Sequence, residues 1–125
     1  MVKNKEISIF HHPQFGDIRT MEMPDGQVGF VGRDVAVALG YNNPQKAVRE
    51  HVDEDDVTKW DTIDAMGRKQ PTLFINESGL YSLVLSSKLP QAREFKHWVT
   101  GEVLPQIRRT GGYIIKGSDP LMSQN

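Results

Sequence analysis

The chain alternates between two hydrophobic periodicities, and this alternation constrains its fold more than any other feature. Up to Val31, and again from Val57 to Ile75, apolar residues tend to alternate with polar ones, as they do in β-strands. The stretches that follow, up to Val52 and up to Arg109, place apolar residues three and four apart, as helices do. This order predicts an α+β fold, in which small antiparallel sheets, built from two β-hairpins and an N-terminal strand, pack with about four helices.

Turn residues support the two hairpins. Pro24-Asp25-Gly26 lies between two strand-like segments, where the proline presets its φ angle and the glycine tolerates a positive one. A second loop, residues 64–69, follows Val57–Ile63, and we predict that it forms an exposed, basic hairpin tip. A further strand is expected at residues 6–10, which alternate and include β-branched side chains.

Between the hairpins, residues 33–52 have the pattern of a helix-turn-helix. A first helix ends at Gly40, which suits a left-handed C-terminal cap, and Pro44 suits the first turn of a second helix. The side chains near the start of the second helix would then face the major groove of DNA: Gln45, Lys46 and Arg49. The turn is about one residue longer than in the strict motif, so an ordinary helical hairpin remains the alternative.

Two more helices are predicted after the second hairpin. Asn76 can cap the first of them, whose apolar residues are Leu80, Leu83 and Val84. The last helix is expected to start at Pro90 and to bury Ala92, Phe95, Val99, Val103 and Ile107. Pro105 falls inside this helix, and a proline ring clashes with the carbonyl four residues earlier, so we expect a kink or break near residues 100–104.

The composition excludes some chemistry and leaves a nucleic-acid partner open. The 125 residues include no cysteine, which excludes disulfides, thiolate metal sites and cysteine nucleophiles. No apolar run approaches the ~18 residues of a membrane span, and no signal sequence is recognisable, which predicts a cytoplasmic protein. Residues 1–64 carry seven Lys/Arg against twelve Asp/Glu, whereas residues 65–125 carry eight against four. A basic half permits a nucleic-acid-binding face without requiring one.

No residue pattern supports catalysis, a cofactor or a metal site. Residues 50–56 contain five acidic side chains but lack the spacing and central glycine of a calcium-binding loop, which favours a solvated loop. The four histidines form no recognised ligand pair. Ser78-Gly79 lacks the leading glycine of a nucleophile elbow, and its glycine is expected to permit close packing. We therefore predict that the protein is not an enzyme.

Three segments together closely resemble the Bro-N domain: residues 30–52 (FVGRDVAVALGYNNPQKAVREHV), 74–81 (FINESGLY) and 93–113 (REFKHWVTGEVLPQIRRTGGY). They occur in the order typical of that family, and the likeness extends from Ile7 to Ile115. The Bro-N domain forms the N-terminal half of many phage and prophage antirepressors and of the baculovirus Bro proteins. The resemblance implies a Bro-N-like domain at residues 1–115, and residues 116–125 are predicted to be a disordered tail or linker.

The resemblance implies two alternative functions, both regulatory. In the first, the domain binds DNA mainly through its phosphates. In the second, it is a protein-interaction module that inactivates a phage repressor by direct contact. The candidate DNA contacts are Gln45, Lys46 and Arg49 in the second helix, Arg68 and Lys69 at the hairpin tip, and Arg93 and Lys96 in the last helix. If the chain is phage-derived, it is expected to act in the cytoplasm of the bacterial host.

Overall fold

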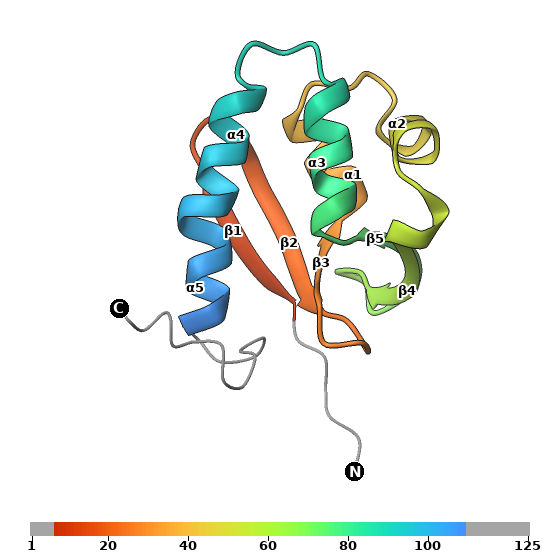
Figure 1. The fold of residues 1–125 in the computed structure, drawn as a ribbon. Coiled ribbons are helices and arrows are strands. Elements are labelled where there is room, and N and C mark those ends of the chain that lie inside the picture. Colours follow the sequence, from red (N-terminus) through yellow and green to blue (C-terminus); the bar gives the residue numbers. More distant parts are fainter. Residues whose placement is uncertain (1–6, 110–125) are drawn as a thin grey trace.

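The computed structural model describes residues 7–109, which form one antiparallel sheet with helices on one face (Figure 1). The strand order is β1-β2-β3-β5-β4. The strands are β1 (Ser8–His12), β2 (Gly16–Glu22), β3 (Val28–Val31), β4 (Val57–Ile63) and β5 (Lys69–Ile75). The predicted α+β class is confirmed, and the hairpins expected as small sheets are joined into a single sheet.

Both predicted hairpins are present, with glycine at the strained position of each turn. In the β2–β3 turn, Gly26 has a φ of 86° and donates a 2.8 Å hydrogen bond to the Met23 carbonyl. In the β4–β5 turn, Gly67 has a φ of 82° and donates a 2.9 Å hydrogen bond to the Asp64 carbonyl. Positive φ values are disfavoured for residues with a Cβ, so glycine stabilises both turns.

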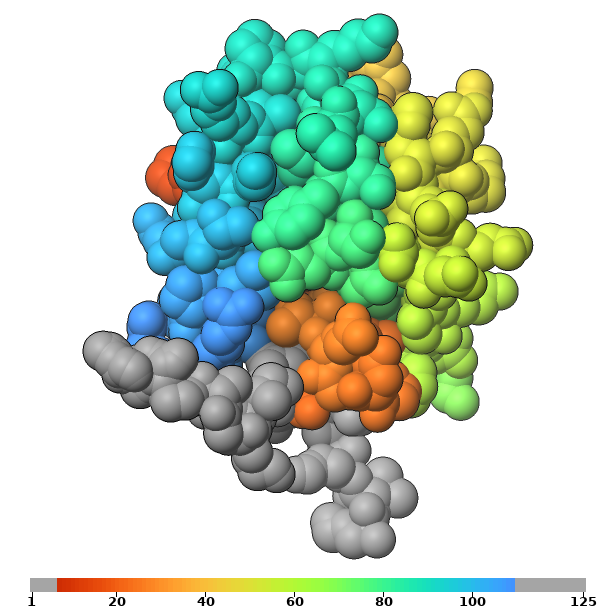
Figure 2. All heavy atoms as spheres, viewed as in Figure 1, coloured from red at the N-terminus to blue at the C-terminus, as the bar shows by residue number. Residues whose placement is uncertain are grey.

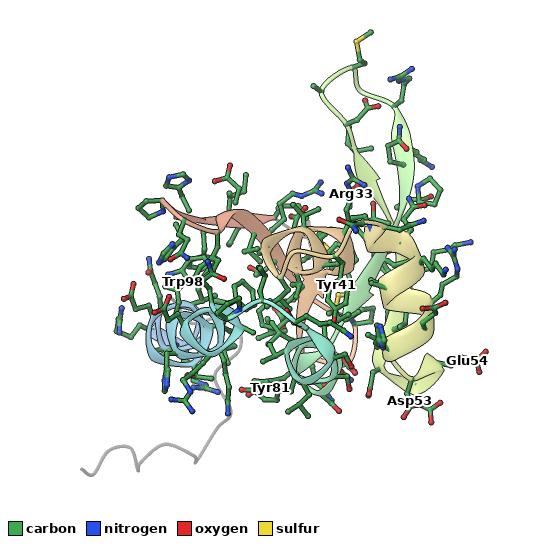
Figure 3. All side chains as sticks on the ribbon, turned by 90° about the horizontal axis from the view of Figure 1, so that it is seen from above. Arg33, Tyr41, Asp53, Glu54, Tyr81 and Trp98 are labelled. Atoms are coloured by element: carbon green, nitrogen blue, oxygen red, sulfur yellow. The ribbon has the colours of Figure 1, made fainter. Side chains whose placement is uncertain are left out.

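The two hairpins are joined by a short contact between β3 and β5. Only two pairs form there, Phe30 with Ile75 and Val31 with Phe74. Strand β4 pairs with β5 along its whole length: Val57 lies opposite Ile75 at one end, and Ile63 lies opposite Lys69 at the other. The part of this hairpin that extends past β3, residues 59–73, is called the hairpin arm below, and Figure 3 shows it projecting from the body of the domain.

The predicted helix-turn-helix-like pair consists of α1 (Gly32–Ala38) and α2 (Pro44–His51). Gly40 lies between them with a φ of 84°, as its predicted capping role requires. Pro44 is the first residue of α2, and the Asn43 side chain caps the helix by accepting a 3.1 Å hydrogen bond from the Lys46 N–H. A short 3-10 turn, η1 (Glu54–Asp56), leads from α2 into β4.

The second half of the chain adds α3 (Glu77–Ser86) and one long interrupted helix. Asn76 caps α3 by accepting a 2.9 Å hydrogen bond from the Gly79 N–H, as predicted. The long helix comprises α4 (Ala92–Trp98), the π-helical segment η2 (Val99–Val103) and α5 (Leu104–Arg109). It begins at Ala92 rather than at Pro90, because residues 89–92 form a turn closed by the Ala92 N–H and the Leu89 carbonyl.

The π-helical segment accounts for the break expected near residues 100–104. Proline has no N–H to donate and its ring crowds the preceding turn. Widening the turn from Val99 to Val103 accommodates Pro105 within a helix that otherwise continues.

The main core lies between the sheet and the helices. Its fully buried side chains include Ile18, Phe30, Val35, Leu80, Leu83 and Phe95. Figure 2 shows α2, α3 and the α4–α5 helix packed next to one another over this core. A second, smaller cluster contains Met21, Met23, Val31 and Phe74, with Trp60 packed against it.

Two sequence expectations concern residues beyond the described range. The predicted tail at residues 116–125 lies outside it, as do the two ends of the predicted domain. Within residues 7–109, no helix has the length and apolar character needed to cross a membrane.

Candidate nucleic-acid interface

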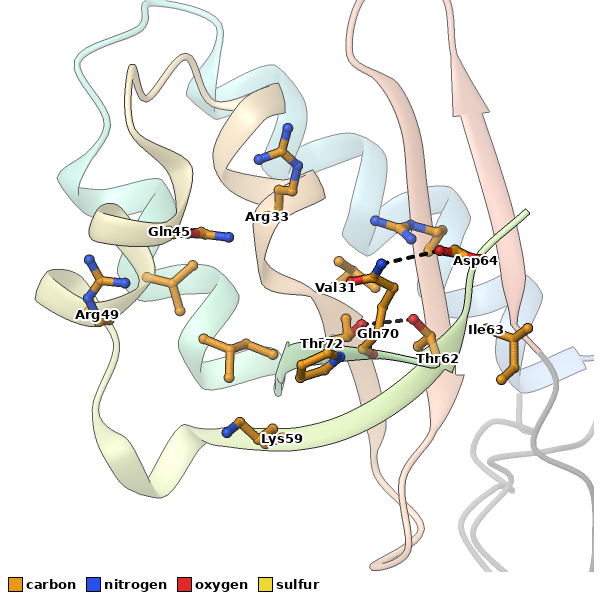
Figure 4. A pocket seen from close by; sticks show the side chains of 14 residues that line it. Val31, Arg33, Gln45, Arg49, Lys59, Thr62, Ile63, Asp64, Gln70 and Thr72 are labelled. Carbon is orange, nitrogen blue, oxygen red and sulfur yellow. Dashed lines mark hydrogen bonds between the residues drawn. The ribbon is translucent and has the colours of Figure 1, made fainter. Parts of the chain in front are cut away.

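A groove of about 450 Å³ lies between α2, the start of α1 and the hairpin arm (Figure 4). Nine of the 14 residues that line it are polar or charged. The cations are Arg19, Arg33, Arg49 and Lys59, the amides are Gln45 and Gln70, the hydroxyls are Thr62 and Thr72, and the single acid is Asp64.

The groove exists because β3 is shorter than β5. Strand β3 ends at Val31, and the chain turns at once into α1, so residues 69–73 of β5 have no strand on that side. Gly32 allows α2 to lie close by, since an added Cβ there would be 3.0 Å from Val48 Cγ2. The side chains of α2 therefore face the arm across the space that a longer β3 would occupy.

One of the four cations, Arg19, is already neutralised. Its guanidinium donates to both carboxylate oxygens of Asp34, with Nε–Oδ2 at 2.8 Å and Nη2–Oδ1 at 2.9 Å. The backbone N–H of Arg19 donates to Asp34 Oδ2 as well, at 3.0 Å. These hydrogen bonds raise the pKa of Arg19, although burial acts in the opposite direction. The pair fixes β2 to α1 and leaves little charge for a ligand.

The other three cations are exposed, and none forms an ion pair within residues 7–109. They are Arg33 on α1, Arg49 on α2 and Lys59 at the base of the arm. These three positive charges, which have no ion-pair partner among the described residues, surround one groove and would attract a polyanion to it. Arginine binds phosphate through two donors at once, and lysine binds it as a point charge. The amides of Gln45 and Gln70 can both donate and accept hydrogen bonds at the same surface.

At the far end of the arm, Asp64 holds the hairpin tip together. Its carboxylate accepts hydrogen bonds from the N–H groups of Met66 and Arg68, each at 2.9 Å. It also accepts from Arg68 Nε at 3.1 Å and from Gln70 Nε2 at 3.2 Å. The bond from the Arg68 N–H is the main reason that the pKa of Asp64 is lowered. The tip is consequently an ordered turn.

The structure brings together only part of the predicted contact set. Gln45 and Arg49 line the groove, whereas Lys46 lies outside its lining and pairs with Glu50 at 3.7 Å. Arg68 and Lys69 lie at the tip of the arm, where Arg68 is paired with Asp64. These two residues extend the basic surface beyond the groove.

The last helix places its two predicted contacts elsewhere. Arg93 and Lys96 lie on α4, which is separated from α2 by α3 (Figure 1). Lys96 is placed over the ring of Tyr81, with 5.9 Å from Nζ to the ring centroid. Neither side chain reaches the groove.

Sequence reasoning missed Arg19, Arg33 and Lys59. These residues come from three separate elements, and only the pairing of β3 with β5 brings them to one groove. The sequence does contain a local indication of which cations are paired with acids. Lys46 precedes Glu50 by four residues, and Asp64 precedes Arg68 by four, which is a common spacing for ion pairs in helices and also occurs across this tight turn.

The acidic residues that follow α2 lie away from the groove. Figure 3 shows Asp53 and Glu54 at the end of the yellow helix that is far from the arm, whereas Arg33 is at the base of the arm. Asp56 has a structural role, because its carboxylate accepts a 3.0 Å hydrogen bond from Asn76 Nδ2. The expectation of a solvated acidic loop agrees with the exposure of Asp53, Glu54 and Asp55. No three side chains of His, Asp or Glu among residues 7–109 converge in a way that could hold a metal ion.

Comparison with known proteins identifies the family. A model described as "BRO family, N-terminal domain" matches residues 17–105. The chain therefore belongs to the Bro-N family, which confirms the resemblance found in the sequence.

Relatives occur in a bacterium and in viruses. An uncharacterized protein of Haemophilus influenzae is 44% identical over 96 residues, which cover 77% of this chain and 47% of that protein. The Bro-N domain-containing protein ORF2 of Autographa californica nuclear polyhedrosis virus is 37% identical over 115 residues, which cover 80% of this chain and 34% of that protein. The chain thus spans less than half the length of these relatives. No solved structure matches the chain.

Proposed function

We propose that this domain is an antirepressor-type regulatory domain that binds duplex DNA, mainly through phosphates, at the groove between α2 and the hairpin arm. The observation that carries the proposal is a set of three cations, Arg33, Arg49 and Lys59, that have no ion-pair partner within residues 7–109 and lie on three elements around one concave surface. A phosphate backbone supplies a matching row of negative charges, and contacts to it need no base sequence.

The shape of the surface favours a duplex over a single strand. Proteins that bind single strands generally stack bases on aromatic side chains, and the groove lining contains no aromatic residue. A helix beside a two-stranded arm can instead place one element in a groove of the duplex and the other along its backbone. In this arrangement, the amides of Gln45 and Gln70 are among the side chains that could contact base edges.

The proposal is tested by fluorescence anisotropy with a labelled duplex of random sequence across a salt series. Three phosphate contacts give a slope of about −2.7 in log affinity against log salt, or roughly forty-fold weaker binding at 200 mM than at 50 mM salt. Arg49→Ala should reduce the magnitude of the slope by about 0.9, because it removes one contact.

Arg93→Ala is the matched control, since Arg93 is also an exposed helical arginine but lies on α4, outside the groove. The two variants should differ in salt slope and share the melting temperature of the wild type. If the wild type shows no salt-dependent binding to DNA at micromolar protein, the proposal fails. Direct contact with a repressor then becomes the better account, and nuclease-resistant co-purification with the repressor tests it.

A further inference from the structure

The tip of the hairpin arm exposes two apolar side chains far from the core. Ile63, which also borders the groove, is 65% exposed at the end of β4, and Met66 is 76% exposed in the turn. Residues 69–73 of β5 carry the tip past the end of β3, a distance of about 16 Å at the usual rise of a strand. Neither side chain belongs to the apolar clusters of the fold.

The tip holds these side chains in a fixed arrangement. Four hydrogen bonds converge on the Asp64 carboxylate between them, and the Asp64 N–H donates to the Arg68 carbonyl at 2.8 Å. Across the strands, Thr62 and Thr72 hydroxyls are 2.8 Å apart and hydrogen-bonded. An arm that is ordered to its end loses little conformational entropy when the end is inserted into a partner.

The surroundings of the tip favour a polyanionic partner. Lys69 lies opposite Ile63 across the two strands, and Lys59 lies at the base of the same arm; neither forms an ion pair within residues 7–109. The carboxylate of Asp64 forms an ion pair with Arg68 at 3.1 Å, so these two charges offset each other at the tip. An apolar end flanked by cations matches a duplex, in which charged backbones border a stacked, apolar interior.

We propose that the arm acts as a wedge, which inserts Met66, supported by Ile63, between neighbouring base pairs and bends the duplex. The proposal rests on the DNA binding proposed above. Exposed Met, Leu, Ile, Phe or Pro side chains act in this way in proteins that bend DNA, where partial unstacking is offset by the additional contacts that the bend permits. Arg33, Arg49 and Lys59, near the base of the arm, would hold the phosphates, and the tip would deform the stack.

A duplex labelled at its two ends for energy transfer tests the wedge, with anisotropy measured on the same samples. A central two-base mismatch fixes where insertion occurs, because unstacking costs least at a mismatched site. The wild type should increase energy transfer and should bind the mismatched duplex several-fold more tightly than the matched one. Met66→Gln, which keeps the length of the side chain and makes it polar, should still bind with an unchanged salt slope but lose both effects.

Leu85→Gln is the control, because Leu85 is 86% exposed on α3 and lies outside the arm. It should bend DNA as the wild type does. Binding without any change in energy transfer would overturn the wedge while leaving the proposed function intact. Bending by Met66→Gln equal to that of the wild type would also overturn it. A wild type that does not bind DNA would remove the proposed function and the wedge together.

Discussion

At the scale of single residues, ion pairing divides the basic side chains of this surface into two groups. Arg19 and Arg68 are held by carboxylates, so their charges stabilise the fold or a turn. Arg33, Arg49 and Lys59 have no such partner within residues 7–109. The i,i+4 spacing made the pairing of Arg68 with Asp64 accessible from the sequence. The convergence of Arg33, Arg49 and Lys59 on one groove could not be predicted from the sequence, because it depends on contacts between elements that are distant in the chain.

Asp64 provides a prediction at this scale. Its folded pKa is lowered below the usual value of 3.8, chiefly by the hydrogen bond from the Arg68 N–H. A carboxylate with a lowered folded pKa stabilises the fold above its unfolded pKa, and this stabilisation is lost as the pH falls through the folded pKa. Asp64→Asn should therefore lower the melting temperature at pH near 7, and the difference from wild type should shrink as the pH falls below about 4.

Asp61→Asn is the matched control for that comparison. Asp61 is an exposed acid on β4, three residues before Asp64, and its side chain makes no hydrogen bond or ion pair within residues 7–109, so its replacement should leave the melting temperature unchanged. Equal melting temperatures for Asp64→Asn and wild type at neutral pH would show that the Asp64 network does not stabilise the tip.

At the scale of elements, much of the fold could be predicted from local residue types. Pro24-Asp25-Gly26 marked one turn, and Asn76 marked the start of α3, because these residues act through neighbours in the chain. Pro105 marked the interruption of the long helix, and the structure resolves it as a π-helical segment. The start of α4 was placed too early, at Pro90, because proline suits a turn as well as the first turn of a helix.

Replacing two helical glycines with alanine should change the free energy of unfolding in opposite directions. Among the described residues, apart from the neighbouring backbone of its own helix, no atom lies within 4 Å of a Cβ added at Gly101. Gly101→Ala should therefore raise the free energy of unfolding by about 0.5–1 kcal/mol through better helix propensity. At Gly79, an added Cβ would be 2.9 Å from Val52 Cγ1 and 3.1 Å from Ile75 Cβ. Gly79→Ala should therefore lower the free energy of unfolding by about 1–3 kcal/mol.

Urea denaturation of both variants beside the wild type measures these changes. A loss of stability in Gly101→Ala would mean that the π-helical segment requires glycine. An unchanged Gly79→Ala would mean that α3 is not packed as closely on the sheet as the structure describes.

At the scale of the whole molecule, the charge distribution differs from what the linear sequence suggests. The groove's four cations all come from residues 1–64, the half with more acidic than basic residues. Folding places the acids Asp53 and Glu54 at the end of α2 that is far from the arm, and so away from these cations (Figure 3). This surface forms because β3 of the first hairpin pairs with β5 of the second through two residue pairs. The periodicity of the sequence does not specify which strand of one hairpin pairs with which strand of the other.

The central claim, that this groove is the DNA interface, is tested most directly by amide chemical-shift mapping of the isotope-labelled domain during titration with a short duplex. Signals from Arg33, the first turns of α2 and the hairpin arm should shift together and return as salt is added, because the contacts are mainly to phosphates. Signals from α4, including Arg93, should stay in place. Shifts concentrated on α4, or an unchanged spectrum at low salt, would contradict the account.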